Sequence, residues 1–274
     1  MKRLIRLLAL DMDGTILDEG GVLPPRRAEL LRELADEGIR ITFVTGRMFR
    51  SAVRYGEMVP LGAPLVAYNG AMIVDLMGVM WYHDPIPEEE TRRVLGFFRD
   101  WGVYVQAYNR EELWVEEATS PASRYYARLS GVEPTQVGDD LYRGGFASTK
   151  ILAVEEDPKR MEELIREARS SFPSLDFYTS KGQFLEVMLK GVNKGRSLEM
   201  LIYFLGIQKD QVLVMGDGDN DSHMLSSFPN SVAVAGASDL AKRSARFVVP
   251  QGAEPVEWIR DNVICGAEPC RCGG

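Results

Sequence analysis

Two aspartates stand directly after a run of apolar residues near the start of the chain. The stretch LLALDMDGT, residues 7–15, places Asp11 and Asp13 one residue apart at the end of a candidate strand. Like charges this close repel each other, and burial makes each ionised carboxylate harder to hold. Either a cation lies between the two carboxylates, or one of them is protonated for a chemical purpose. Because Asp-x-Asp-Gly is also typical of a plain turn, the pair alone leaves both interpretations open.

A second acidic group follows another apolar run. Asp217, Asp219 and Asp221 come directly after the candidate strand QVLVM and Gly216. In open α/β sheets ligands bind outside the carboxyl ends of the strands, so we expect both acidic groups at one edge. Carboxylates, backbone carbonyls and water are the ligands that Mg²⁺ prefers. The sequence therefore predicts a magnesium site rather than two unrelated turns.

Two further positions could bind a phosphate group. Lys194 stands in the first turn of a predicted helix, where its charge opposes the helix dipole, so we expect it to have an anionic partner. Thr45, Gly46 and Arg47 follow a second candidate strand, and a hydroxyl with backbone N–H groups at a helix start suits a phosphate. The alternatives are a solvated lysine and an ordinary turn at the end of a strand.

The segments that must position these residues alternate between strand and helix. Predicted strands cover residues 3–10, 39–44 and 64–74, with helices at 24–38 and 46–59 between them. The third strand closes in an Asn69-Gly70 turn with a hairpin-like return. This order is typical of a parallel sheet with crossover helices. The same rhythm returns later in the chain, with a helix at 193–207, strands at 211–216, 231–236 and 246–250, and a short helix at 239–245.

Between these two parts the rhythm changes. Residues 83–189 contain helices at 87–102 and 158–172 and strands at 103–109, 112–118, 150–157 and 183–189. We therefore predict an α/β protein with a Rossmann-like doubly wound parallel-sheet core, formed by residues 1–82 and 190–264. An inserted two-layer α/β cap domain of residues 83–189 interrupts the core, and a mobile tail of residues 265–274 follows it.

Composition argues against several classes of protein. A net charge of −8 disfavours a nucleic-acid surface, and no apolar run approaches the roughly 20 residues of a membrane helix. The cysteines are confined to the tail, at Cys265, Cys270 and Cys272, in a spacing that matches no common zinc site. A body without disulfides is usual for intracellular proteins. We expect a cytoplasmic monomer or homodimer without nucleic-acid or membrane partners.

Histidine chemistry is also disfavoured. The chain has two histidines, His83 and His223, in unrelated contexts, which makes a Ser/His/Asp triad or a His-rich metal site improbable. The basic and apolar start of the chain, MKRLIRLLAL, is interpreted as a first strand rather than a secretory signal, because acidic residues stand where a cleavage site should be.

Taken together, the four polar groups resemble the four motifs of the haloacid dehalogenase superfamily of phosphatases. Residues 11–15 are similar to the first motif, residues 44–47 to the second, Lys194 to the third and residues 216–221 to the fourth. The large α/β insertion between the second and third motifs resembles the Cof-type branch, whose members carry a two-layer α/β cap. The segments YNGA, from Tyr68, and SHML, from Ser222, add to the match.

The resemblance implies a role for each residue. Asp11 is the expected nucleophile, which forms an aspartyl-phosphate, and Asp13 is the expected general acid and base. The implied Mg²⁺ ligands are Asp11, the backbone carbonyl of Asp13 and Asp217, with support from Asp221. The implied substrate-binding residues are Thr45, Gly46, Arg47, Asn69, Lys194 and Asn220.

The expected function is a Mg²⁺-dependent phosphatase for small phosphomonoesters, such as sugar phosphates or related metabolites. A phosphosugar mutase on the same machinery and a phospho-ligand sensor without turnover are the alternatives. The chain departs from the superfamily at residues 236–238, where Gly-Ala-Ser replaces the more frequent Gly-Asn-Ala, and at PQGAEPV, residues 250–256. The loop contacts around Asp217 are therefore not implied by the resemblance.

Overall fold

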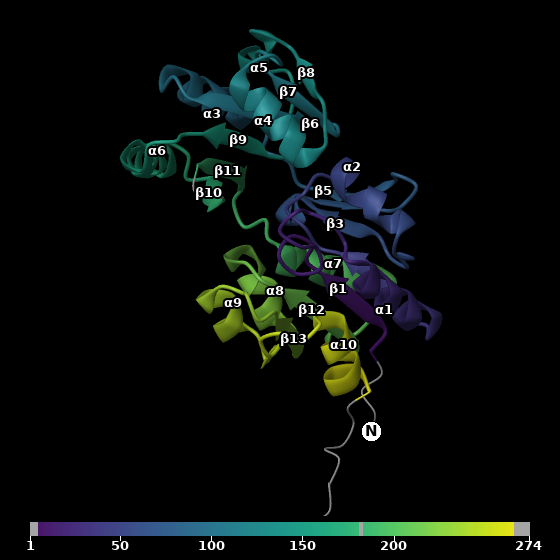
Figure 1. Cartoon of the computed structure of the whole chain (residues 1–274). Coiled ribbons are helices and arrows are strands. Elements are labelled where there is room, and N and C mark those ends of the chain that lie inside the picture. Colours follow the sequence, from purple (N-terminus) through teal and green to yellow (C-terminus); the bar gives the residue numbers. More distant parts are fainter. Residues whose placement is uncertain (1–4, 181–182, 266–274) are drawn as a thin grey trace, which may run out of the picture. The chain divides into compact units, whose positions relative to one another are not determined.

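The chain divides into two compact units in the computed structural model, which describes residues 5–180 and 183–265 (Figure 1). The first unit comprises the described residues of 1–46, 52–81 and 193–274, and the second comprises those of 47–51 and 82–192. Residues 47–51, which the sequence analysis had assigned to the core, thus group with the insertion. Of the predicted tail, only the exposed Cys265 lies within the described residues.

A five-stranded parallel sheet forms the centre of the first unit, in the order β14-β13-β12-β1-β2. Its strands are β1 (Leu7–Leu10), β2 (Arg40–Phe43), β12 (Val212–Gly216), β13 (Asn230–Ala233) and β14 (Phe247–Val248). Strand β1 pairs with β12 on one side and β2 on the other, and all four of its residues are buried. A strand covered on both faces needs the continuous apolar run found in the sequence.

The hairpin-like return predicted after Asn69 and Gly70 is confirmed, but the hairpin lies outside the parallel core sheet. It forms β3 (Leu65–Ala67) and β4 (Met72–Val74), which belong to a separate three-stranded sheet with β5 (Met80–His83). A single parallel bridge between Val44 and Val66 connects β3 to the end of β2. The strand is interrupted because Tyr68 and Asn69 both adopt a positive φ, which turns the chain back on itself.

Helices of the first unit fall into two packed groups, as expected for a doubly wound sheet. They are α1 (Pro25–Asp36), α7 (Lys194–Leu205), α8 (Ser222–Ser227), α9 (Asp239–Ser244) and α10 (Pro255–Ile259). Helix α1 packs against α10, whereas α7 packs against α8 and α8 against α9. The helix predicted over 46–59 is only α2 (Phe49–Ala52) and a 3₁₀ turn (Val53–Glu57), which contains the poor helix former Gly56.

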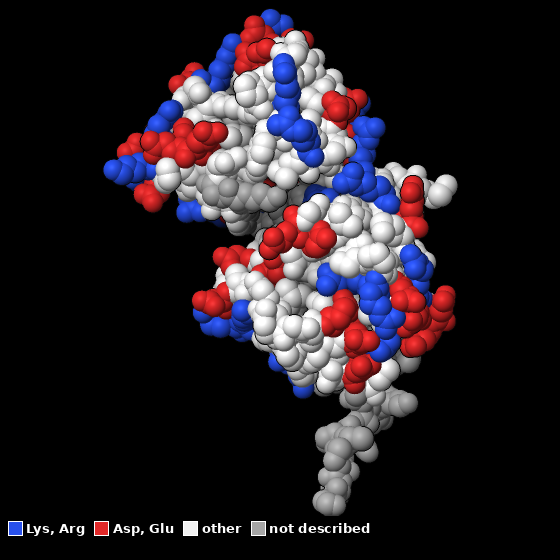
Figure 2. Space-filling view, in the orientation of Figure 1, with Lys and Arg blue, Asp and Glu red and all other residues white. Residues whose placement is uncertain are grey.

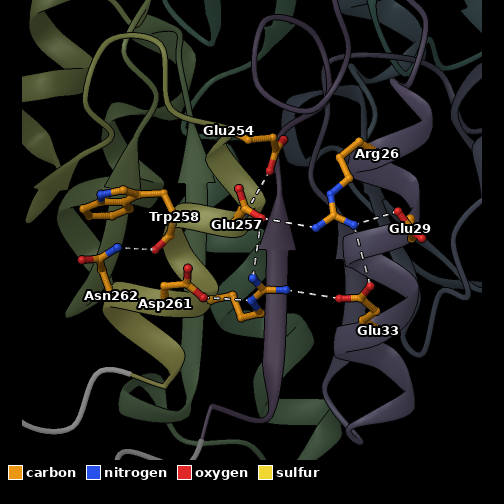
Figure 3. Close-up of polar contacts among 9 residues, drawn as sticks. Arg26, Glu29, Glu33, Glu254, Glu257, Trp258, Asp261 and Asn262 are labelled. Atoms are coloured by element: carbon orange, nitrogen blue, oxygen red, sulfur yellow. Dashed lines mark hydrogen bonds and ion pairs between the residues drawn. The ribbon is translucent and has the colours of Figure 1, made fainter.

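Ion pairs on the surface connect α1 with α10 and the turn that follows it (Figure 3). Arg26 lies between Glu29 and Glu257, and Arg260 contacts Glu33. The Arg26 side chain is 51% exposed, so solvent screens its interactions. Exposed pairs of this kind contribute little, because solvent and salt screen them, and this network is therefore a minor factor in stability.

The second unit is an α/β sandwich with its own core. Its six-stranded sheet has the order β10-β11-β9-β6-β7-β8 and is antiparallel except for the β7–β8 pair. The strands are β6 (Tyr104–Asn109), β7 (Glu112–Val115), β8 (Pro134–Gln136), β9 (Ile151–Val154), β10 (Leu175–Ser180) and β11 (Phe184–Leu189). The helices are α3 (Glu88–Asp100), α4 (Pro121–Ser130), α5 (Asp140–Arg143) and α6 (Pro158–Ser171).

One face of this sheet is buried under α3 and α6. Val94 and Phe98 of α3 and Leu164 of α6 share a hydrophobic cluster with Ala153 and Leu185 of the sheet. A parallel core sheet and a separate, largely antiparallel sheet confirm the fold class predicted from the sequence.

Charged side chains of both signs are interspersed over the face of the molecule shown in Figure 2. Within the part of the chain that the structure describes, no helix combines the length and apolar character needed to cross a bilayer.

Candidate active site

The first and last acidic groups of the sequence meet at one edge of the parallel sheet. Leu10 is opposite Met215 in the pairing of β1 with β12, so both strands end at the same level. The backbone N–H of Asp11 donates to the carbonyl of Met215 at 2.9 Å, which fixes the chain where it leaves β1. Two stretches more than 200 residues apart in the sequence are thereby brought together.

Lys194 lies between two of these carboxylates. Its Nζ donates to Asp11 Oδ1 at 2.5 Å and to Asp221 Oδ1 at 2.7 Å, and its side chain is fully buried. Burial favours the neutral amine, but the two carboxylates outweigh this effect and raise the pKa of Lys194. Lys194 is therefore charged across the physiological range, with the anionic partners expected from its place in the first turn of α7.

Asp11, Asp217 and Asp221 form a group that fits a hard divalent cation. Each offers one carboxylate oxygen, and these oxygens lie within 4.8 Å of one another. Burial, followed by repulsion from Asp221, raises the pKa of Asp11 and of Asp217, against the opposing effect of Lys194. Three carboxylates and one ammonium leave two negative charges uncompensated, which one divalent cation would balance.

Asp221 differs from the other two carboxylates in its hydrogen bonds. Its Oδ1 accepts from Lys194, and its Oδ2 accepts from the backbone N–H groups of Asp217 and Gly218 at 3.0 and 2.9 Å. Asp221 thus holds both the lysine and the loop that carries Asp217. Gly216 leaves room for it, because a Cβ there would lie 2.6 Å from Asp221 Cγ.

The turn after Asp11 closes over Asp217. Gly14 has a φ of +79°, and a Cβ at this position would lie 2.2 Å from Asp217 Oδ2. The hydroxyl of Thr15 donates to Asp217 Oδ1 at 3.3 Å. Backbone and side chain of this turn therefore define where the Asp217 carboxylate lies.

The predicted substrate-binding residues of the first unit lie in neighbouring turns. The N–H of Asn69 donates to the carbonyl of Thr45 at 2.9 Å, and Asn220 Nδ2 donates to Asn69 Oδ1 at 3.0 Å. A Cβ on Gly46 would lie 2.9 Å from Asn69 Oδ1, so this close approach needs glycine. Asn69 also has a φ of 52°, a conformation that clusters at functional sites.

Asp13 and Arg47 are the remaining predicted site residues. The side chain of Asp13 is exposed, unlike that of Asp11, and its role as acid and base stays a prediction. Arg47 belongs to the second unit, and its role in substrate binding also stays a prediction.

The structure adds residues that the sequence analysis did not identify. The N–H of Ser238 donates to the carbonyl of Asp217 at 2.8 Å, and its hydroxyl donates to Asp219 Oδ1 at 2.6 Å. The departure from the superfamily at residues 236–238 therefore leaves this loop attached to Asp217. Arg27 and Glu254 support the turn after Asp11 from outside the cluster. Neither has a sequence signal of its own, since charged residues on helices are usually solvated.

The second unit contains a cavity of about 650 Å³. Its lining includes the aromatic side chains of Tyr104, Tyr125 and Phe184 together with the polar Gln183 and Glu156. Burial raises the pKa of Tyr104 to about 12, so its hydroxyl stays protonated and hydrogen-bonds to Gln106 and Ser123. The sequence analysis had assigned no residue of this unit beyond Arg47 to the site.

Comparison with known proteins decides the family. The family model of haloacid dehalogenase-like hydrolases matches residues 8–254, which include all four polar groups. The chain belongs to this family. The superfamily and the enzyme class expected from the sequence are thereby confirmed.

Several members of the haloacid dehalogenase-like family are similar along most of their length. The 5-amino-6-(5-phospho-D-ribitylamino)uracil phosphatase YitU of Bacillus subtilis is 24% identical over 249 residues, covering 87% of this chain and 90% of that protein. The HMP-PP phosphatase of Serratia proteamaculans is 27% identical over 233 residues, covering 85% and 84%. A crystal structure of a haloacid dehalogenase-like hydrolase from Bacteroides thetaiotaomicron has the same fold, with a TM-score of 0.82 at 24% identity, covering 89% and 93%.

Proposed function

We propose that this haloacid dehalogenase-like chain is a Mg²⁺-dependent cytoplasmic phosphatase that hydrolyses small phosphomonoesters through an aspartyl-phosphate on Asp11. The observation that supports this most strongly is the buried cluster at the end of β1 and β12. There Lys194 contacts Asp11 and Asp221, and the carboxylate of Asp217 lies beside them.

In the first step a carboxylate oxygen of Asp11 attacks phosphorus and the bond from phosphorus to the leaving oxygen breaks. Asp11 must be ionised to attack, although burial and its acidic neighbours raise its pKa. The ammonium of Lys194 opposes that effect and favours the ionised form. Bound Mg²⁺, held by Asp11, Asp217 and the backbone carbonyl of Asp13 with Asp221 in support, would supply positive charge against the anionic phosphate.

Asp13 transfers protons in both halves of the reaction. It donates a proton to the leaving alcohol, then accepts one from the water that attacks the aspartyl-phosphate. Its exposed position allows exchange with solvent, whereas Asp11 is buried. This contrast in exposure supports different roles for the two nearby carboxylates.

Phosphate oxygens are held by Lys194 and by the turns that follow β2 and β3. Thr45, Gly46 and Arg47 contribute from one turn, Asn69 from the other, and Asn220 is hydrogen-bonded to Asn69. Donors fixed before the substrate arrives stabilise the charge that develops on the transferring group.

The test is phosphate release from a panel of esters, with and without Mg²⁺. The panel contains sugar phosphates, phosphoglycolate, nucleotides, pyridoxal phosphate and flavin mononucleotide. It also contains 5-amino-6-(5-phospho-D-ribitylamino)uracil, the substrate named for a relative. We expect Mg²⁺-dependent release of free phosphate from at least one ester. An isomerised sugar phosphate as product would indicate a mutase instead, and binding without turnover across the panel would indicate a sensor.

A further inference from the structure

Arg27 of α1 holds the turn that follows Asp11 through hydrogen bonds to its backbone. Its Nη1 donates to the backbone carbonyls of Ile16 at 2.8 Å and Thr15 at 3.2 Å. Its Nε donates to Glu254 Oε1 at 2.7 Å, and its side chain is only 15% exposed. One guanidinium thus joins the turn to the start of α10.

The same turn also contacts Asp217. The hydroxyl of Thr15 donates to Asp217 Oδ1, and Gly14 packs so closely on Asp217 that no Cβ fits between them. A shift of the turn by a few tenths of an ångström would therefore move or release the Asp217 carboxylate. Since Arg27 bonds to the carbonyl of Thr15 itself, the guanidinium lies one residue from the hydroxyl that orients Asp217.

Glu254 fixes the guanidinium in turn. Its Oε2 accepts from the N–H of Glu257 at 2.8 Å, which caps α10, while its Oε1 accepts from Arg27. Only arginine offers donors in a rigid planar fork, so it can bind a carboxylate with Nε and two carbonyls with Nη1 together. Lysine would bring a single ammonium to the same place.

We propose that Arg27, fixed by Glu254, is a positioning residue for divalent-ion binding, acting through Thr15 on Asp217. This inference rests on the proposed function, because it takes Asp217 as a metal ligand. Its neighbour Arg26 provides a matched control: it precedes Arg27 on α1 and forms ion pairs with Glu29 and Glu257, but it contacts neither the turn nor Glu254 in any hydrogen bond between described residues.

The test compares Arg27→Gln, Arg27→Lys and Arg26→Gln in the full chain, with Mn²⁺ binding followed by electron paramagnetic resonance in the absence of substrate. Mutation of residues that orient metal ligands typically lowers metal affinity by about 10–100-fold. We expect about a tenfold loss of Mn²⁺ affinity for Arg27→Gln. The Mn²⁺ affinity of Arg27→Lys should lie between those of Arg27→Gln and wild type. Arg26→Gln should bind Mn²⁺ as wild type does. Equal losses for Arg26→Gln and Arg27→Gln would overturn the proposal.

A double-mutant cycle with Thr15→Val tests the route from Arg27 to Asp217. If Arg27 acts through the Thr15 hydroxyl, Arg27→Gln should cost much less affinity for Mn²⁺ in the Thr15→Val background than in wild type. Fully additive losses would overturn that route. Should Arg27→Gln fail to fold, Glu254→Gln and Arg27→Lys replace it in the same cycle.

The positioning role of Arg27 and the proposed phosphatase function can be confirmed or contradicted independently. A chain that releases no phosphate but still loses Mn²⁺ affinity in Arg27→Gln would contradict the phosphatase and support the positioning role. A chain that hydrolyses esters normally, with Mn²⁺ affinity unchanged in Arg27→Gln, would support the phosphatase and overturn the positioning role.

Discussion

Lys194 is the residue on which the cluster depends electrostatically. It is completely buried, yet burial of a lysine without partners would favour its neutral form. Here two carboxylates within hydrogen-bond distance keep it charged, and it in turn makes the burial of Asp11 and Asp221 tolerable. Each of these charges therefore stabilises the others in their buried, ionised form.

Lys194→Met should destabilise the metal-free protein strongly. Removing one partner of a buried ion pair typically costs about 3–5 kcal/mol, because the remaining charges stay buried and unpaired. The free energy of unfolding in urea at neutral pH measures this loss. Lys209→Met is the control: its pair with Glu199 is about half exposed, so the change should cost less than about 1 kcal/mol. Equal losses in the two variants would contradict the electrostatic role of Lys194.

The raised pKa values of Asp11 and Asp217 predict how Mg²⁺ stabilises the protein at different pH. Because both folded-state pKa values lie above the ordinary 3.8, the metal-free folded state binds more protons than the unfolded state above that pH. The contribution of these groups to stability therefore falls as pH rises through this window. Mg²⁺ binds the ionised carboxylates and offsets this loss.

We therefore expect Mg²⁺ to raise Tm more at about pH 8 than at about pH 5, where protons compete for the carboxylates. Calorimetry with Mg²⁺ and with a chelator, at both pH values, measures the two increments. In Asp217→Asn the increment should shrink at the higher pH. An increment in wild type that is the same at both pH values would refute this interpretation of the acidic cluster.

At the scale of elements, the turn between β1 and α1 is the part of the fold most closely adapted to the site. It carries Asp13, it contacts Asp217 through Gly14 and Thr15, and its backbone carbonyls accept hydrogen bonds from Arg27. The parallel pairing of β1 with β12 sets the level at which all of these meet.

Gly14→Ala tests how closely this turn fits. The substitution imposes the cost of a positive φ on alanine, roughly 1–2 kcal/mol, and also forces a methyl group against Asp217 Oδ2. We expect a loss of Tm together with a much higher Mg²⁺ requirement and at least a tenfold loss of kcat, on the order of what displaced metal ligands cause.

Gly78→Ala is the matched control for this change. Gly78 has a φ of +82°, close to that of Gly14, but nothing lies within 4 Å of its missing Cβ. The Gly78→Ala variant should therefore lose a similar amount of stability from backbone strain, and its Mg²⁺ requirement and kcat should stay as in wild type. If Gly14→Ala behaves like Gly78→Ala in activity, the contact with Asp217 is not important for the reaction.

At the scale of the whole molecule, the sequence predicted the fold class and the gathering of the acidic loops with Lys194. It could do so because strand-end position and residue type suffice to bring Asp11, Asp217 and Asp221 to one edge. It did not predict α8 and α10, which are six and five residues long and too short to show an apolar period, and it also missed the ten-residue α4. Arg27 and Glu254 were missed because a contact between a helix and backbone carbonyls leaves no pattern in the sequence.

The hairpin at residues 64–74 was predictable because its turn has a local sequence signal. Asn69 and Gly70 mark the reversal, and the positive φ of Tyr68 and Asn69 separates β3 from β4. The packing of the start of α7 against Gly70 is a tertiary contact that the sequence pattern does not predict.

The central claim, that Asp11 is the nucleophile of a phosphoryl-transfer site, is tested most directly by trapping the intermediate. Wild type and Asp11→Asn are mixed with a ³²P-labelled ester and Mg²⁺ and quenched in acid, and the label is located by peptide mapping. We predict label on the peptide that contains Asp11 in wild type. Asp11→Asn should carry no label and lose at least about a thousandfold in turnover, while Asp36→Asn, an exposed carboxylate at the end of α1, behaves as wild type. Turnover that persists in Asp11→Asn, or label on a different residue, would contradict the claim.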